Sequence, residues 1–482
     1  MAEAAMSIEF EDIQGLVRFG YKHLTQACFL LLRIRDAGAA RAWLANAPVT
    51  SAITRKPPPR TAVQIAFTCA GLHALGAAED IVEGFSAEFL AGMSSDESRA
   101  RRLGDLGAND PARWQWGGAQ DRMPHVLVML YAVPGELDEW LRTIRAQCEA
   151  GFEQLDCLST SDMDGVEPFG FVDGISQPRI DWERERAAHD EEQFEYTNLS
   201  CLGEYLLGYP NEYGAYTDRP LLDRARDPAA LLPRAEDDAD KADLGRNGSY
   251  LVMRQLRQDV EGFWRFVDGQ AGGDAALSEK LAETMVGRTK KGKPLVEVSG
   301  ETDDLNAFTY DGDPEGLRCP FGAHIRRSNP RNADLPPGWS DPISRLVRRL
   351  GFGSDALRND LIASTRFHRL LRRGREYGGA PGEDVGLHFI CLGANIARQF
   401  EFVQGAWLAG TKFDALPGEG DPLLGHRLAG ADGMPTDGFS IPAASGPDRR
   451  LTGLPQFVTV QGGAYFFLPG IRALRYLSKV QP

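Results

Sequence analysis

The chain has 482 residues, of which 43% are hydrophobic, and it carries a formal net charge of −15. This length and apolar content predict two or three domains with a sizeable core. The acidic balance argues against nucleic acid as a main partner, because phosphate binding requires a basic face. The sequence has no apolar run of about 18 residues, so we expect no membrane-spanning helix.

The start of the chain and its cysteines indicate a reducing compartment. Residues 1–11 are acidic and contain neither the apolar core of a signal peptide nor the paired arginines of a twin-arginine leader. The seven cysteines are scattered and form no CxxC pair. This pattern is typical of free thiols rather than of a disulfide framework or a structural zinc site. We therefore expect a cytoplasmic protein.

The first half of the chain alternates predicted strands with predicted helices. Short apolar runs at 29–34, 61–68 and 125–132 predict buried strands. Residues 135–155 place apolar side chains at helical spacing and predict an amphipathic helix. This alternation fits an α+β module, which we place at residues 8–179.

Residues 180–247 have a different composition. They contain runs of charged residues and, at 203–214, a stretch rich in glycine and tyrosine. Because this segment holds too many aromatic residues for free coil, we interpret it as a linker with an extended loop that packs across both halves.

The second half, residues 248–476, again reads strand, helix, strand. We expect strands at 245–258, 386–393 and 459–468, and helices at 259–270, 277–288 and around 399–407. No sequence repeat connects the two halves, so their similarity rests on this pattern alone.

One basic stretch, residues 319–331, places His324 after a Pro-Phe-Gly turn and before a cluster of three arginines. A neutral imidazole is a good axial ligand for iron, and arginines beside it suit the carboxylates of a bound porphyrin. The alternative is a structural histidine in a basic loop.

Two further stretches favour the first interpretation. Residues 169–178 contain a GxxDG motif at 170–174, and residues 367–378 form a basic segment. The three stretches, in this order, resemble the dye-decolorising peroxidase family of haem enzymes. The resemblance runs from Asp12 to about Gly470. It implies two ferredoxin-like modules with facing antiparallel sheets, and haem mainly in the C-terminal module.

The resemblance also implies a role for each motif. His324 would be the axial ligand of the iron. Asp173 would carry a proton between the two peroxide oxygens as general base and then general acid, although an aspartate in such a turn also caps its own backbone. Arg372 would stabilise the charge that develops on peroxide, with Arg373 as the second choice.

Further haem contacts follow from the same resemblance. Arg331, and with it Arg326, would pair with the propionates. Leu387 and Phe389 either line an apolar wall or belong to an ordinary core strand. Because the chain has no CxxCH motif, we expect haem b held non-covalently. The remaining contacts implied are Gly174, Ile175 and Ser176 on the distal side, and Asn329 and Pro330 after the histidine.

Two points depart from a simple transfer of the family pattern. Where the family often has an acidic residue that bonds the proximal histidine, the matching position here is Asn395. Either another carboxylate or a backbone carbonyl takes that role, or the iron is less electron-rich. Among the other histidines, His388 is the main competitor for the iron, and His368 is expected to be structural.

We therefore predict a haem peroxidase that reduces hydrogen peroxide and oxidises a small organic donor, such as a phenol or a dye, in one-electron steps. Two alternatives stay open on the same fold. One is a non-catalytic haem or porphyrin carrier, which has no need for both Asp173 and Arg372. The other is an enzyme that releases iron from haem.

Overall fold

The computed structural model describes residues 7–185, 198–298, 303–331, 365–379, 383–430 and 433–480. Its N-terminal half is an antiparallel ladder in the order β2-β3-β1-β4. With one helix after the first strand and one after the third, this is the ferredoxin-like arrangement. The elements are β1 (Gln26–Ile34), α2 (Ala37–Leu44), β2 (Thr61–Phe67), β3 (Val126–Ala132), α7 (Leu137–Cys148) and β4 (Phe152–Ser159).

The three predicted strands of this half are confirmed, but the predicted helix at 135–155 is too long. Helix α7 ends at Cys148, and β4 begins at Phe152 after Gly151. Gly151 leaves no room for a side chain, because a Cβ there would lie 2.6 Å from the backbone nitrogen of Ala40. The close approach of the chain at this glycine separates the helix from the strand that follows it.

Short helices fill the connection between β2 and β3. The side chains of Thr68, Ser86 and Asp96 cap the first turns of three of them by accepting backbone N–H groups. The helices are α3 (Cys69–Leu75), α4 (Glu79–Val82), α5 (Ala87–Ala91) and α6 (Glu97–Leu103).

The C-terminal half repeats the arrangement in the order β10-β12-β9-β15, with β11 also paired to β12. Asp259 and Asp274 cap the two helices that follow β9. The elements are β9 (Ser249–Gln258), α8 (Val260–Gln270), α9 (Ala275–Val286), α10 (His324–Ser328), β10 (Leu371–Arg372), β11 (Arg375–Tyr377), β12 (Gly386–Gly393) and β15 (Val458–Leu468). The segment predicted as one helix around 399–407 forms two π-helical stretches, Ala397–Glu401 and Val403–Ala409.

The two halves meet in two ways. Phe467 of β15 pairs with Phe67 of β2, which joins the ladders into one nine-stranded sheet. One face of each ladder also packs against the other, since Phe29 and Tyr131 share a buried cluster with Met253 and Ile390. The fold is therefore α+β with two ferredoxin-like modules whose sheets face one another, as predicted.

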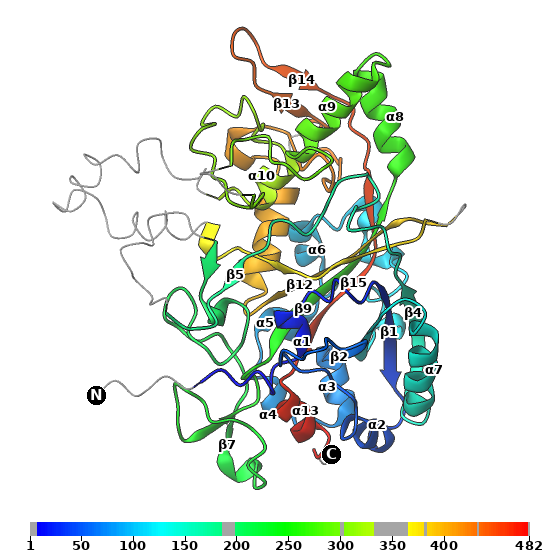
Figure 1. Ribbon diagram of the computed structural model, residues 1–482, viewed down its shortest axis with the longest axis vertical. Helices are drawn as coiled ribbons and strands as arrows, with labels where there is room; N and C mark the ends of the chain where they lie inside the picture. Colours follow the sequence, from blue (N-terminus) through cyan, green and yellow to red (C-terminus); the bar gives the residue numbers. More distant parts are fainter. Residues whose placement is uncertain are drawn as a thin grey trace, which may run out of the picture.

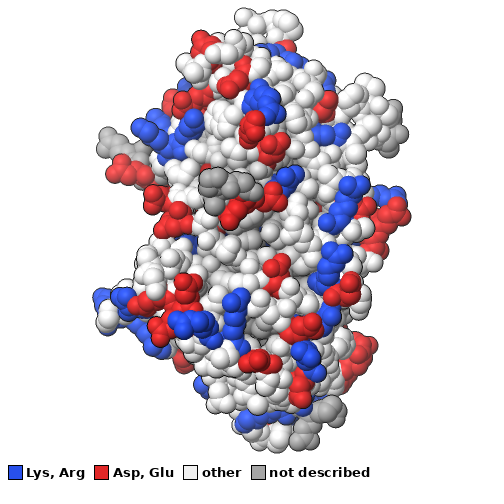
Figure 2. All heavy atoms as spheres, turned by 90° about the vertical axis from the view of Figure 1, so that its right-hand side faces the viewer, with Lys and Arg blue, Asp and Glu red and all other residues white. Residues whose placement is uncertain are grey.

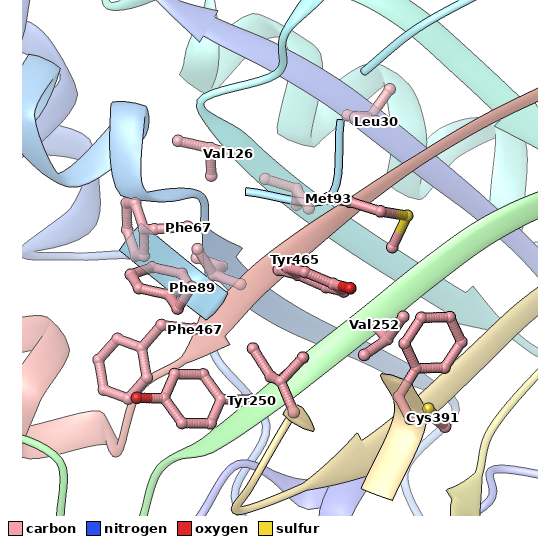
Figure 3. Packing of buried hydrophobic residues seen from close by; sticks show 14 of the residues in the cluster. Leu30, Phe67, Phe89, Met93, Val126, Tyr250, Val252, Cys391, Tyr465 and Phe467 are labelled. Carbon is pink, nitrogen blue, oxygen red and sulfur yellow. The ribbon is translucent and has the colours of Figure 1, made fainter. Parts of the chain in front are cut away.

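The opposite face of each ladder is covered by helices. In Figure 1, α2, α3 and α7 lie at the N-terminal half, and α8 and α9 lie at the far end of the C-terminal half. Figure 3 shows this packing around the junction, where Phe67 and Phe467 lie with Phe89 and Tyr250. The core thus runs without interruption through both modules.

The predicted linker contacts both halves. Asn247 donates hydrogen bonds to Asp12 and Glu9 near the N-terminus, whereas Glu204 accepts two hydrogen bonds from Arg398 of the C-terminal half. The boundaries of the three segments, 8–179, 180–247 and 248–476, remain predictions.

Acidic and basic side chains are interspersed on the face seen in Figure 2. Across the described part of the chain, no helix is both long and apolar enough to cross a membrane.

Candidate active site

A cavity lies on the helix-covered face of the C-terminal ladder. Strands β9, β12 and β15 form its floor through Leu256, Leu387, Phe389, Val458 and Val460. Its other walls come from the loop that contains the GxxDG motif, from α10, and from the second π-helical stretch. All three motifs singled out in the sequence therefore meet at this cavity, although they are far apart along the chain.

His324 is the first residue of α10 and lines the cavity. Its Nδ1 lies 3.0 Å from Oδ2 of Asp421, whose side chain is fully buried. The backbone N–H groups of Leu423 and Leu424 donate to the other carboxylate oxygen at 2.9 and 2.8 Å. Because Asp421 occupies Nδ1, the neutral ring keeps its lone pair at Nε2, the nitrogen available to a ligand in the cavity.

The electrostatics of this pair favour a basic imidazole. Burial lowers the pKa of His324, but the charge and hydrogen bond of Asp421 raise it more, so that it lies above its usual value. Burial likewise raises the pKa of Asp421, and the facing histidine with the Leu424 N–H brings it below the usual range. The carboxylate is therefore ionised.

Asp421, and not the residue at position 395, is the hydrogen-bond partner of His324. The side chain of Asn395 accepts a hydrogen bond from the backbone N–H of Arg398 instead of bonding to the histidine. The carboxylate comes instead from 97 residues beyond the histidine. No local pattern in the sequence marks this residue.

Arg327 holds the segment before Asp421 against α10, where His324 lies. Its guanidinium is buried and donates to the carbonyl of Trp407 at 2.7 Å and to that of Glu419 at 2.9 Å. These bonds fix the loop that leads to Asp421 against α10. Burial lowers the pKa of Arg327 to about 10, so the group is still charged.

Asp173 and Arg372 face the same cavity as a pair. Nη1 of Arg372 donates to Oδ1 of Asp173 at 2.7 Å, and both side chains are about one-third exposed or less. Burial raises the pKa of Asp173, but the charge and hydrogen bond of Arg372 lower it by a larger amount. The pKa of Asp173 therefore lies below its usual value. Gly170 and Gly174 have φ values of 99° and 77°, which the turn around Asp173 requires and which glycine adopts without strain.

The alternation of strand β10 separates Arg372 from Arg373. Arg373 points to the opposite face and donates to the carbonyls of Leu16 and Val17 in the N-terminal half. Gln177 holds Arg372 in place, since its side chain accepts from the backbone N–H of Arg372 at 3.0 Å and donates to its carbonyl at 3.2 Å. The geometry therefore places Arg372, not Arg373, beside Asp173.

The competing histidines have structural partners. His388 is 1% exposed, faces the N-terminal half, and lies 2.9 Å from the carbonyl of Ser159. His368 lines the cavity, but it stacks on Phe402 and bonds through Nδ1 to the carbonyl of Arg398. Burial lowers the pKa of both histidines to about 4.

Several of the predicted contact residues line the cavity, whereas Gly174, Pro330, Arg326 and Arg331 do not. The residues that do are Ile175, Ser176, Asn329, Leu387 and Phe389. Arg326 is buried against Asp313 and the carbonyl of Cys319, and Arg331 donates to the carbonyls of Asn306 and Phe308. The expectation that these arginines pair with propionates is therefore not supported. They stabilise the loops around α10.

Arg288 also lines the cavity, although it was not among the residues predicted for the site. Its Nη2 donates to the hydroxyl of Ser176 at 2.9 Å, and its Nη1 donates to the carbonyl of Gly292 at 2.6 Å. Burial, with the nearby charge of Arg331, lowers the pKa of Arg288 to about 10. The triplet Gly-Arg-Thr after α9 carries no recognisable signal.

Glu167 is a second carboxyl group at the cavity. It accepts hydrogen bonds from the backbone N–H groups of Phe169 and Phe171 and from the side chain of Gln258. Burial raises its pKa to about 7 despite these donors. It thereby fixes the start of the loop that carries Asp173.

This donor set fits a haem group. An imidazole with a bonded carboxylate, a carboxylate–guanidinium pair, an apolar floor and the cationic Arg288 all line one cavity. A haem needs each of these: a ligand for iron, polar groups near peroxide, apolar contacts for the ring and cations near its carboxylates.

Known proteins similar to this chain include several peroxidases. A multifunctional dye peroxidase of Amycolatopsis is 29% identical over 405 residues, which cover 76% of this chain and 74% of that protein. A dye-decolorizing peroxidase of Mycetinis scorodonius is 27% identical over 512 residues, covering 99% of this chain and 89% of that protein. A comparison with models of known protein families found no match.

Solved structures with the same fold are also peroxidases. A fungal peroxidase from Auricularia auricula-judae has a TM-score of 0.72 at 24% identity and covers 98% of this chain and 100% of that chain. A dye-decolorizing peroxidase in complex with 2,6-dimethoxyphenol has a TM-score of 0.69 at 23% identity and covers 97% of this chain and 98% of that chain. The chain therefore has the fold of these peroxidases, and the relatives that it resembles along most of its length are dye peroxidases.

Proposed function

We propose that this chain is a haem peroxidase that reduces hydrogen peroxide and oxidises organic donors, such as phenols or dyes, in one-electron steps. The observation that carries the proposal is the contact of 2.7 Å between Asp173 and Arg372 in the cavity that also contains His324. A protein that only stores haem has no use for this pair.

The cofactor in this proposal is haem b, held without a covalent bond. Nε2 of His324 would be its axial ligand, and Asp421 would keep the ring in the tautomer that leaves Nε2 free. Ile175, Ser176, Asn329, Leu387 and Phe389 line the cavity and would contact the ring. Gly174 and Pro330, their neighbours in the chain, are proposed as further contacts. Arg288 is the cavity cation suited to a propionate.

Bound haem would supply the redox chemistry: the two electrons that reduce peroxide would come from it, and organic donors would replace them one at a time. The side chains move the protons. The carboxylate of Asp173 accepts a proton from one peroxide oxygen and delivers it to the other, which then leaves as water. Arg372 stays protonated throughout and stabilises the negative charge that develops as the O–O bond breaks.

Arg372 has a second effect on Asp173. By lowering the pKa of the carboxyl group, it keeps Asp173 ionised and therefore able to accept a proton at neutral pH. The apolar floor formed by Leu387 and Phe389 limits the water that would compete for this proton. In this pair, Asp173 thus carries the proton, and Arg372 keeps Asp173 ionised.

We also propose hydrogen peroxide and a small organic donor as the partners of this site, and a cytoplasmic location. The location rests on the scattered free cysteines alone. Fractionation of the native host cells would test it.

The experiment that tests the function replaces Asp173→Asn and, separately, Arg372→Leu in the haem-reconstituted protein. We expect the Soret absorbance to be retained and the kcat/KM for peroxide to fall by at least about 100-fold, the range of a lost general acid–base group. Asp162→Asn is the matched control, because Asp162 lies exposed in the same loop region. A carrier, or an enzyme that only releases iron, would lose nothing in the Asp173 variant.

A further inference from the structure

Two cysteines from different strands lie in contact at the far side of the N-terminal half from the haem cavity. Cys28 is on β1 and Cys157 is on the neighbouring strand β4, and their Sγ atoms are 2.7 Å apart. In the register of the two strands, Leu30 is opposite Cys157 and Ser159 is opposite Cys28. The two cysteines therefore point to the same face as a diagonal pair, only about 0.6 Å farther apart than the sulfurs of a disulfide.

The surroundings make one of these thiols reactive. Either thiol can donate in this contact. With Cys28 as the donor, the hydrogen bond, together with the charge of Arg145 on α7, lowers the pKa of Cys157 to about 7 despite burial. The thiolate is the nucleophile in cysteine oxidation. Arg145 is held over the pair by its hydrogen bond of 2.9 Å to Gln154.

A small molecule has access to the pair. Strand β4 is the outer strand of the ladder, and Cys157 is partly exposed on it. A cavity lined by Leu30, Arg145 and Gln154 lies between α7 and the strands β1 and β4, and Leu30 is the residue opposite Cys157. Hydrogen peroxide is small enough to enter such a space.

The neighbouring Cys148 serves as a contrast. It is on α7 and lines the same cavity, but burial raises its pKa to about 12, so it stays a thiol at neutral pH. Cys319 is similar, with its pKa raised to about 12 by burial. Proximity and reactivity coincide at Cys28 and Cys157.

We propose that Cys28 and Cys157 are a second, peroxide-reactive site, which closes into a reversible disulfide. The Cys157 thiolate attacks one oxygen of hydrogen peroxide, the O–O bond breaks, and the other oxygen leaves as water after taking a proton. The sulfur of Cys28 then attacks the resulting sulfenic acid and releases a second water, with loss of its own proton. Two thiols thus give up two electrons and two protons to one peroxide, and thiol reductants reverse the step.

The disulfide would tie β4 to β1 at the start of the segment that leads to the loop of Asp173. Strand β4 ends at Ser159, and Thr160 continues the pairing through its hydroxyl, which donates to the carbonyl of Ala27 at 3.0 Å. The bond would close a loop of 129 residues. Constraint of so long a loop is expected to raise the Tm by roughly 5 °C.

The test uses the haem-loaded chain, treated with a few equivalents of hydrogen peroxide and then with N-ethylmaleimide. Mass spectrometry of a non-reduced digest should show the Cys28 and Cys157 peptides joined, lighter than the two reduced peptides by two hydrogen atoms. Dithiothreitol should separate them. Cys28→Ser and Cys157→Ser should each abolish the joined peptide, whereas the matched control Cys148→Ser should keep it.

Two outcomes would overturn the proposal. Both cysteines could remain fully labelled by N-ethylmaleimide after peroxide, or Cys157 could end as sulfinic acid with no joined peptide. Both can be read on the unmodified chain, so the test does not depend on the folding of the variants. The Asp173→Asn variant should still form the disulfide, which keeps this proposal separate from the fate of the proposed peroxidase activity.

Discussion

At the scale of single residues, two carboxylates of the candidate site each have one charged or polar side-chain partner. Asp173 bonds to the guanidinium of Arg372, which lowers its pKa and suits the proton transfer proposed for it. Asp421 bonds to the imidazole of His324 and would determine how strongly this ring donates to a bound iron, as proposed. Each aspartate contacts its partner side chain through one hydrogen bond. Replacement by asparagine removes its negative charge with almost no change in side-chain size.

Asp421→Asn is expected to weaken the donor strength of His324. An amide cannot supply the negative charge that makes the imidazole more basic. We expect the reduction potential of the bound haem to rise and peroxidase turnover to fall by about 10–100-fold, with the haem still bound. Spectroelectrochemical titration measures the potential, and Asn395→Ala is the control that should leave it unchanged. An unaltered potential in the Asp421 variant would contradict this role.

The raised pKa of Glu167 should make the stability of the chain depend on pH. Its pKa is raised to about 7 in the folded chain, so between about pH 4.5 and 7 the folded state binds more protons than the unfolded state. The free energy of unfolding should therefore fall as the pH rises through this window, by up to about 3 kcal/mol for this group.

Glu167→Gln removes the titrating group and should flatten this part of the stability curve. Urea unfolding at several pH values measures the slope, and Glu153→Gln on the exposed side of β4 is the control. If the slope of the Glu167 variant equalled that of the unmodified chain, the carboxyl group would not titrate as described.

At the scale of elements, the site depends on short segments held by side chains rather than on long helices. Strand β10 has two residues, and the side chain of Gln177 bonds to both backbone groups of Arg372. This contact fixes the distance between the loop that carries Asp173 and the strand that carries Arg372. Arg327 does the same for α10 and the loop before Asp421.

Gln177→Ala should loosen the catalytic pair without removing either member. Loss of two hydrogen bonds is expected to cost about 1–3 kcal/mol of stability, and the kcat/KM for peroxide should fall by roughly 10-fold while the haem content stays the same. Stopped-flow kinetics at limiting peroxide measures this loss. An equal rate in the variant would show that the loop and β10 are held by other contacts.

The elements also show which patterns in the sequence predict structure. The apolar runs that became β1, β2, β3 and β12 were identified correctly, because buried strands need continuous apolar side chains. Strand β4 was not identified, since it is half exposed and follows α7 after one tight glycine turn. The π-helical stretches were also missed, because their periodicity in sequence resembles that of an α-helix.

The same limit applies to the cavity. His324, Asp173 and Arg372 lie in motifs, so the sequence predicted where they belong. Packing between segments far apart in the sequence places Asp421 beside His324 and Arg288 at the cavity, and no local sequence pattern predicts either residue. Arg326 and Arg331 show the reverse error, since a buried structural arginine and an arginine that binds an anion look alike in sequence.

At the scale of the whole molecule, the two ladders join into one sheet at a single residue pair, in addition to the packing of their facing sides. Phe467 is fully buried at this junction and lies 4.7 Å from the ring of Phe85. A large cavity here would disturb the N-terminal helices and the strand β15 that forms part of the haem cavity floor. The stability of the haem site should therefore depend on a contact far from it.

Phe467→Ala is expected to lower the free energy of unfolding by about 3–5 kcal/mol, the cost of a buried phenyl ring and the space it leaves. Leu277→Ala, whose side chain on α9 is 54% exposed, should change it by less than about 0.5 kcal/mol. Denaturant unfolding followed by circular dichroism measures both. A loss as small as that of the control would mean that the junction does not hold the modules together.

The measurement that tests the central claim most directly is the absorption spectrum of the haem-reconstituted chain before and after one equivalent of hydrogen peroxide. We expect a Soret band that changes within the mixing time of a stopped-flow experiment and returns when a phenolic donor is added. In Asp173→Asn the same band should be present but respond far more slowly. A Soret band that ignores peroxide in the unmodified chain would contradict the account and leave a haem carrier, and the absence of any Soret band would mean that His324 is only a structural histidine.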